Sequence, residues 1–354
     1  MPSLRLTECE QFRFLVFLTG HSDRVLIALA VKIKVNSSLK NGHTMKFAFK
    51  GLLVLFVSGI YVSSQASLDP FVSAFGDFNA MVFSNLNGNS GDSEGRLGVG
   101  GNMTTTVNSY SVGDRATLDH SKNSLVVGGT LSTVNNWQVF NGNARYGAAG
   151  ANLPSMQSGF NIAQATNVFD FASAKSQLLG LSQSLAALSA NGSSVFQFST
   201  YTLTGTDANL NVFNVNAADW ATATDHQIHA TAGSTVIVNF TGTSISMSNG
   251  MAADAGIYDA AGRTSHILFN FADATTLNIT SMALLGSVLA PKANLTISGG
   301  SINGLAAVNS ATQLNGGEFH SYGYTGSTPV PEPASLAVIG LGLIGLVSRR
   351  KKRS

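Results

Sequence analysis

The chain has 354 residues, with 20 Lys and Arg against 18 Asp and Glu, so its formal charge is only +2. Charged residues make up 11% of the chain, where about 25% is typical, while apolar residues make up 44%. The apolar content excludes an intrinsically disordered chain, and a single cysteine, Cys9, excludes a disulfide framework.

An export signal begins at residue 45. Lys46 and Lys50 form a positive n-region, residues 52–62 form an apolar core, and Ala66 ends a small-x-small cleavage site. We therefore expect a signal peptide over 45–66 that directs the chain to the general secretory route and is cut before Ser67.

Residues 1–44 fit badly ahead of this signal, because their apolar patches are broken by basic residues. We interpret them as an over-extended start, with a long atypical leader as the alternative. The exported region, 67–328, then holds seven Lys and Arg against fourteen Asp and Glu, a charge of about −7. An anionic surface repels phosphate backbones, so nucleic-acid binding is not expected.

A turn rich in acids and glycines opens the exported region. Its residues are Asp92, Glu94, Gly95, Gly100 and Gly101. Acids two residues apart can share one face of a strand. We interpret them first as solvated turn residues, and the alternatives are capping of backbone amides, binding of a cation such as Ca²⁺, and glycan hydrolysis. The glycines lack the spacing and the lysine of a phosphate-binding loop, so we interpret them as turn residues.

Two internal repeats predict the architecture. LGVGGNM (97–103) recurs as LVVGGTL (125–131), and LNITSMALLGSVLAP (277–291) recurs as LTISGGSINGLAAVN (295–309). A short strand, a glycine turn and a second short strand, repeated in this way, predict a mainly β protein built as a parallel β-solenoid, or β-helix. A β-sandwich with hairpins at similar spacing is the alternative.

One accompanying helix is predicted over about 170–190. Asp170 is its N-cap, apolar residues follow at helical spacing, and Asn191-Gly192 ends it. The predicted strands are 196–203, 210–215, 235–240, 266–271 and 295–297.

The tightest group of possible metal ligands is His226 and His229. Two residues three apart share a face of a helix but lie on opposite faces of a strand, and no third ligand accompanies them. We expect polar loop positions and no metal site here. For Trp137 and Trp220 we expect half-buried packing in the core or at an edge, with stacking on sugar rings as the alternative. No residue pattern indicates a catalytic or cofactor-binding site, so we expect no enzyme.

The C-terminus combines three ordered features. Pro331, Glu332 and Pro333 hold the backbone extended, and the apolar run 334–348 follows. As a transmembrane helix, about 15 residues reach roughly 22 Å, which is short for a bilayer. Five basic residues come next and would stay cytoplasmic: Arg349, Arg350, Lys351, Lys352 and Arg353.

These features resemble the PEP-CTERM sorting signal of Gram-negative bacteria, over 329–354. The resemblance implies transient anchoring in the inner membrane, processing by an exosortase-type enzyme, and delivery to the outer envelope or extracellular matrix. It also implies an association with exopolysaccharide and biofilm.

The body is similar to the choice-of-anchor A domain. The resemblance lies in the opening DSEGRLGVGGN (92–102) and in the closing GSVLAPKANLTISGGSINGLAAV (286–308) and GGEFHSYGY (316–324). No activity is established for that family, and the ending is also similar to ice-binding and adhesive β-solenoids. We therefore expect a non-enzymatic structural or adhesive surface protein that contacts cell-surface glycans. The alternatives are an ice-binding or adhesin-like solenoid and a secreted glycan hydrolase.

Overall fold

The computed structural model divides the chain into two units, Met1–Ser67 and Leu68–Ser354. In the first unit it describes three strands that pair antiparallel: β1 (Arg13–His21), β2 (Arg24–Lys32) and β3 (Leu53–Val54). In the second it describes residues 69–106, 110–134, 137–258 and 264–328. The predicted cleavage site at Ala66 and the sorting signal from 329 onward lie outside the described residues.

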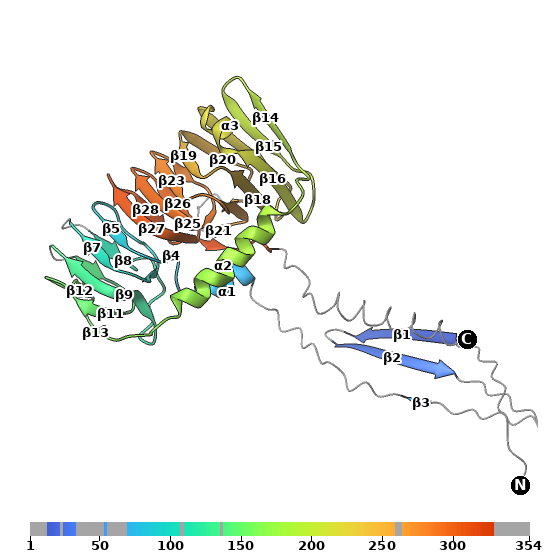
Figure 1. The fold of residues 1–354 in the computed structure, drawn as a ribbon, viewed down its shortest axis with the longest axis horizontal. Coiled ribbons are helices and arrows are strands. Elements are labelled where there is room, and N and C mark those ends of the chain that lie inside the picture. Colours follow the sequence, from blue (N-terminus) through green and yellow to red (C-terminus); the bar gives the residue numbers. More distant parts are fainter. Residues whose placement is uncertain are drawn as a thin grey trace, which may run out of the picture. The chain divides into compact units, whose positions relative to one another are not determined.

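The second unit is a stack of coils with strands that pair in parallel from coil to coil (Figure 1). Its first face carries ten strands, in the order β13 (Ile162–Gln164), β11 (Asn143–Ala149), β9 (Asn123–Thr133), β6 (Leu97–Val99), β4 (Ala80–Val82), β27 (Ala306–Leu314), β25 (Ser287–Ser298), β22 (Ile267–Asn270), β18 (Thr235–Thr241) and β16 (Leu210–Asn216).

A second face forms from the later halves of β9, β25 and β27 together with four short strands. These are β7 (Met103–Thr105), β5 (Leu86–Gly88), β23 (Thr276–Thr280) and β19 (Ser244–Ser248).

Further short strands make up the remaining sheets. They are β8 (Ser111–Val112), β10 (Gln138–Val139), β12 (Ser155–Met156), β24 (Ala283–Leu284), β26 (Ser301–Asn303) and β28 (Glu318–His320), then β14 (Ser193–Gln197), β15 (Thr200–Thr204), β17 (Asp225–His229) and β20 (Gly250–Ala253), and the pair β21 (Thr264–Ser265) and β29 (Gly323–Tyr324). Ser93 bridges the strands around Val112 and Phe319, so it joins β8 to β28 across the stack.

The described part of the second unit begins and ends in the middle of this stack. From β4 the coils proceed to one end at β13, and helix α2 (Phe171–Ala186) then runs along the first face to the other end (Figure 1). The chain resumes at β16 and returns to the middle, where β27 pairs with β4 through Ala306 and Ala80. We call this pairing of the first and last strands of the main sheet the seam.

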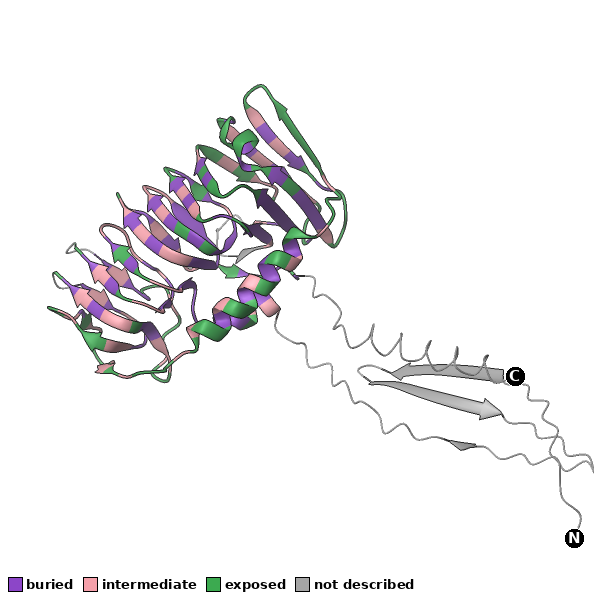
Figure 2. Cartoon of the chain, in the orientation of Figure 1, coloured by how far each residue is buried: buried purple, intermediate pink, exposed green. Residues whose placement is uncertain are grey.

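The seam is covered by two helices packed on the first face. Short helix α1 (Pro70–Phe75) and α2 bury apolar side chains against strand residues such as Met81 and Leu289, in a core separate from the interior of the coils. Along α2, buried and exposed residues alternate in Figure 2, as an amphipathic helix requires. A third short helix, α3 (Ala217–Ala221), follows β16.

The predicted helix is confirmed at its start. The Asp170 carboxylate accepts a hydrogen bond from the Ser173 amide at 2.9 Å, and α2 begins at the next residue. Its predicted end was wrong, because the helix stops at Ala186. Asn191 instead fastens the outer edge of β16, accepting from the Val212 amide at 2.7 Å.

Both sequence repeats are confirmed as neighbouring coils. Leu97 pairs with Leu125, and Leu277 pairs with Leu295, in parallel register. This register is that of a solenoid and not of the alternative β-sandwich. A Cβ on Gly128 would lie 2.5 Å from the Gly100 oxygen, so glycine at this corner lets the coils approach.

One predicted strand, 196–203, is instead a hairpin. The turn between β14 and β15 places Phe198 and Ser199 at φ 50° and 64°, a conformation usually adopted by glycine or asparagine. Without those turn residues the segment has the pattern of one continuous strand. Within the described ranges no helix is both long and apolar enough to cross a bilayer; the predicted helix 334–348 lies outside them.

Candidate functional site

The second face carries a row of small polar side chains, one from each of seven coils. Each member pairs directly with the next across parallel strands, in the order Ser246, Asn278, Thr296, Thr312, Asn87, Thr104 and Ser132. We call this row the polar ladder.

Strand alternation explains why the ladder points outward. In β23, Leu277 and Ile279 are buried while Asn278 between them is partly exposed, and the other coils repeat this pattern. Parallel strands lie about 4.8 Å apart, so seven rungs span about 29 Å. No rung carries a charge, and the neighbouring row from Ser244 through Thr276 to Asn294 is also uncharged.

The ladder is the feature that the sequence did not reveal. Thr104 belongs to the run Thr104-Thr105-Thr106, but Thr105 is buried and only Thr104 is a rung. The signal was present in the repeats, because the offset of 28 relates Thr104 to Ser132 and the offset of 18 relates Asn278 to Thr296.

The two choice-of-anchor A-like segments, far apart in sequence, meet at the seam. Glu94 accepts a hydrogen bond from the Ser321 amide at 2.9 Å, and the Asp92 carbonyl accepts one from the Gln313 side chain at 2.7 Å. Gly95 permits this approach, since a Cβ there would lie 3.1 Å from Ser321 Oγ as well as 2.4 Å from the Cβ of Asn79. The Glu94 carboxylate and the Asp92 backbone carbonyl therefore join the predicted turn to the closing part of the body.

The protonation of Asp92 in this turn is controlled first by burial and then by neighbouring acids. Burial, assisted by Glu318, Asp114 and Glu94, raises the pKa of Asp92 to about 7. The Asp92 Oδ1 atom has no hydrogen-bond partner among the described residues. Within the same residues no group of three His, Cys, Asp or Glu side chains is arranged to hold a metal ion.

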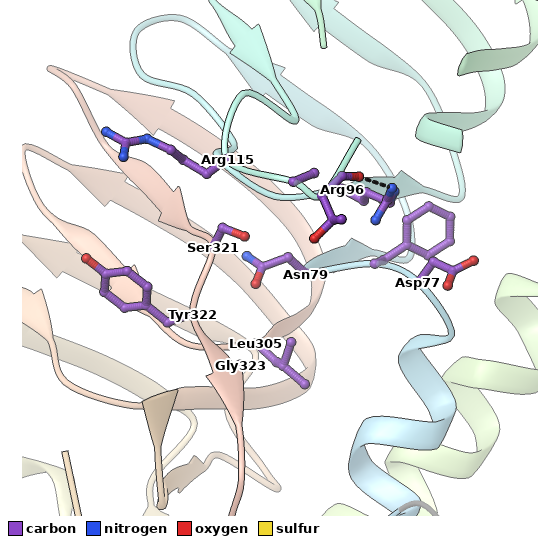
Figure 3. Close-up of a pocket in the computed structure, with 11 residues that line it drawn as sticks. Asp77, Asn79, Arg96, Arg115, Leu305, Ser321, Tyr322 and Gly323 are labelled. Atoms are coloured by element: carbon purple, nitrogen blue, oxygen red, sulfur yellow. Dashed lines mark hydrogen bonds between the residues drawn. The ribbon is translucent and has the colours of Figure 1, made fainter. Parts of the chain in front are cut away.

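Beside the turn lies a cavity of about 320 Å³ (Figure 3). Its polar lining includes Asn79, Arg96, Thr117, Ser321 and Tyr322. Figure 3 shows that Asn79 and Arg96 come from the start of the body, whereas Ser321 and Tyr322 come from its last coil. We call this cavity the seam pocket.

The two predicted histidines lie in strand β17 and not in a loop. His226 is buried, stacks on Trp220 at 4.1 Å between ring centroids, and contacts the Trp220 and Gly250 carbonyls at 3.0 Å each. His229 is exposed and pairs with Asp254 at 3.0 Å, so the two rings face opposite ways. Trp137 and Trp220 both lie in the core, one of the predicted positions, but they are fully and not half buried.

Two family models match the chain. The model described as "Putative Ice-binding-like adhesive domain" covers residues 71–321, and the PEP-CTERM protein-sorting motif covers residues 329–352. The second match confirms the sorting signal and thereby indicates an exosortase-dependent surface protein. The first is consistent with a choice-of-anchor A-like body and points to a non-catalytic, adhesive role.

Among solved structures, the chain resembles an ice-binding protein from the Antarctic ascomycete Antarctomyces psychrotrophicus, with 14% identity, a TM-score of 0.30, and coverage of 73% of this chain and 98% of that one. It also resembles a glycosylated ice-binding protein from an Arctic yeast, with 11% identity, a TM-score of 0.32, and coverage of 74% and 95%. No curated protein matched the chain. Because the adhesive-domain model spans well over half of the sequence, the chain belongs to the ice-binding-like adhesive domain family.

Proposed function

We propose that the protein is a non-enzymatic adhesin of the outer envelope or extracellular matrix that binds an extended, hydroxyl-rich carbohydrate surface along the polar ladder. The observation that carries this proposal is the register of the seven rungs, which repeats one small polar group from coil to coil. Membership of an adhesive-domain family supports it.

The chemistry of the ladder suits a neutral polymer. Hydroxyl and amide groups both donate and accept hydrogen bonds, and an uncharged row avoids the cost of desolvating ions. Each hydrogen bond contributes only about 0.5–1.5 kcal/mol net, so useful affinity comes from several coils that engage one chain together.

Bulky substitutions on the ladder test this proposal. Thr296→Tyr and Thr312→Tyr on adjacent rungs would block a flat ligand, while Ser155→Tyr on β12 makes a comparable change on another sheet. In a glycan array and a pull-down with the producer's own exopolysaccharide, we expect the ladder variants to lose at least tenfold in binding and the control to retain it. Empty results with the wild-type protein in both assays would remove the carbohydrate proposal.

Export and processing form a separate part of the proposal. We propose a signal peptide over 45–66, cleavage between Ala66 and Ser67, anchoring through 334–348, and exosortase processing near Pro331. The sorting-motif match supports the last two steps. The intact mass of protein recovered from culture fluid and outer envelope tests all of them: a species from Ser67 to near Pro331 is expected, and one that keeps Arg349–Arg353 would contradict processing.

A second candidate function is the binding of ice or ordered water. The uniform spacing of about 4.8 Å and the absence of charge along the ladder favour it, and the family description names it. Thermal hysteresis measured on wild-type protein and Thr296→Tyr distinguishes the two: hysteresis lost in the variant supports ice binding, and none in the wild type removes it. We do not propose glycan hydrolysis, since Glu94 is held by the Ser321 amide.

A further inference from the structure

The seam pocket contains an arginine, and some of its hydrogen-bond donors have no acceptor within the described residues. Arg96 donates one hydrogen bond, from Nη2 to the Thr117 carbonyl at 2.7 Å. Its Nε is enclosed without a partner, and its Nη1 has no hydrogen-bond partner among the described residues and is not enclosed. An arginine fork with open donors is the side chain best suited to a carboxylate.

Nearby acids do not neutralise this guanidinium. Asp77 is held by Lys122 at 2.9 Å, and Arg115 lies 4.0 Å from Glu94 and 3.7 Å from Asp114. Among the described residues, no carboxylate lies within 4.0 Å of Arg96. Asp119 is near enough to interact electrostatically with Arg96, but no carboxylate of the described residues pairs with it directly, so in a body of net negative charge the pocket presents a cation without an ion-pair partner.

The rest of the lining is suited to hydroxyl groups. Asn79, Thr117 and Ser321 contribute amide and hydroxyl side chains to the same cavity, whereas the Tyr322 side chain points away from Arg96 in Figure 3. Its volume, about 320 Å³, lies at the lower end of the range of about 300–1,000 Å³ found for small-ligand sites. A compact ligand that carries several hydroxyls and one carboxylate matches this combination.

The pocket is assembled only in the complete fold. Arg96 belongs to the DSEGR turn and Ser321 to the closing GGEFHSYGY segment, and these meet because the first and last strands pair at the seam. The Asn79 amide donates to the His320 carbonyl at 2.8 Å, which fixes the two sides relative to each other. The same residues that mark the family motif therefore also line the pocket.

From these observations we infer that the seam pocket binds a single carboxylate-bearing sugar, of the uronic acid class, with Arg96 on the carboxylate and the neutral side chains on the hydroxyls. This site lies apart from the polar ladder and goes beyond the proposed function. It would add recognition of an acidic sugar residue to adhesion along a neutral surface.

Ligand titration tests the inference on the protein recovered from its producing cell, at 0.15 M salt. D-glucuronate is the probe, and methyl β-D-glucoside is its neutral counterpart of similar shape. We expect glucuronate to bind at least tenfold more tightly than the glucoside, by calorimetry and ligand-observed NMR. Equal binding of both sugars, or binding of neither at millimolar concentration, would overturn the inference.

Two single substitutions test whether glucuronate binds at Arg96. Arg96→Gln removes the charge while keeping a polar amide at the level of Nε, and it should lower glucuronate affinity at least tenfold. Arg145→Gln, on a cation that bonds Asn161 elsewhere on the stack, is the matched control and should bind as the wild type does. An equal loss in both variants would indicate general charge attraction and contradict the site.

A second readout covers the case in which Arg96→Gln does not fold. In the wild-type protein, glucuronate should shift the methyl resonances of Leu305, which lines the pocket, and leave those of Leu131 in the coil interior unchanged. Failure of the ladder variants to affect glycan binding would leave this result untouched, so the two proposals are tested independently.

Discussion

The carboxylate of Asp69 accepts hydrogen bonds from both the backbone amide and the hydroxyl of Thr328, joining the two ends of the described body. The same carboxylate caps α1 by accepting from the Phe71 amide at 2.9 Å. Thr328 is buried, and Pro331 follows it by only three residues. The point where the body ends and the sorting signal begins is therefore fixed to the first turn of the first helix.

Asp69→Ala should lower the free energy of unfolding by about 2–3 kcal/mol, since it removes a helix cap and leaves the buried Thr328 amide and hydroxyl without an acceptor. Thr328→Val removes only the hydroxyl donor and should cost about 1 kcal/mol. Denaturant unfolding of both variants checks this order. If both variants lost the same free energy of unfolding, the helix cap and the hydrogen bond from the Thr328 amide would contribute nothing to stability.

Three asparagines at paired positions on neighbouring strands form a second set of polar contacts, which joins α2 to the first face. Asn239 lies in its middle, and Asn270 forms its buried end, donating to the Ser182 carbonyl at 2.9 Å and to Asn239 Oδ1 at 2.8 Å. Asn270→Ala should cost about 2–3 kcal/mol, because it leaves buried partners unsatisfied. Asn214→Ala, on the exposed end of the same row, is the control and should cost under about 1 kcal/mol, by thermal or denaturant unfolding.

Asp92 should make the body less stable as pH rises. Its pKa is raised from 3.8 to about 7 in the folded state, so between about pH 4 and pH 7 the unfolded state loses this proton first and the free energy of unfolding falls. Asp92→Asn should remove this dependence and stabilise the protein at pH 8 by about 1 kcal/mol, the full shift being reduced because the carboxyl is partly solvated. Unfolding curves from pH 4 to 8 check this, and identical profiles for the two proteins would contradict it.

Gly128→Ala should destabilise the coil corner, because the new methyl group would meet the Gly100 oxygen at 2.5 Å and that oxygen is a backbone atom that cannot turn aside as a flexible side chain could. We expect a loss of about 1–3 kcal/mol, as for other overpacked sites. Gly180→Ala is the matched control, since a Cβ at that helical position meets nothing within 4 Å. It should be neutral or stabilising in the same melting experiment.

The sequence was most informative where structure is local or repeated. The N-cap at Asp170 and the pairing of Leu277 with Leu295 follow from capping chemistry and from a repeat read directly along the chain. The ladder could not be found in this way, because Asn87 and Thr312 are neighbours across the seam yet lie near opposite ends of the exported region. The same separation hid the seam pocket, although both segments that build it had been identified as motifs.

The pairing of β4 with β27 also determines when folding can finish. In an uninterrupted solenoid, coils can form one after another from any starting point. Here the central coils remain incomplete until residues 306–308 reach Ala80–Val82, a pairing between strands far apart in the sequence. If the chain is exported N-terminus first, the edge of β4 that faces β27 stays unpaired until almost the whole body has crossed the membrane. β27 then pairs with β4 shortly before the sorting signal follows.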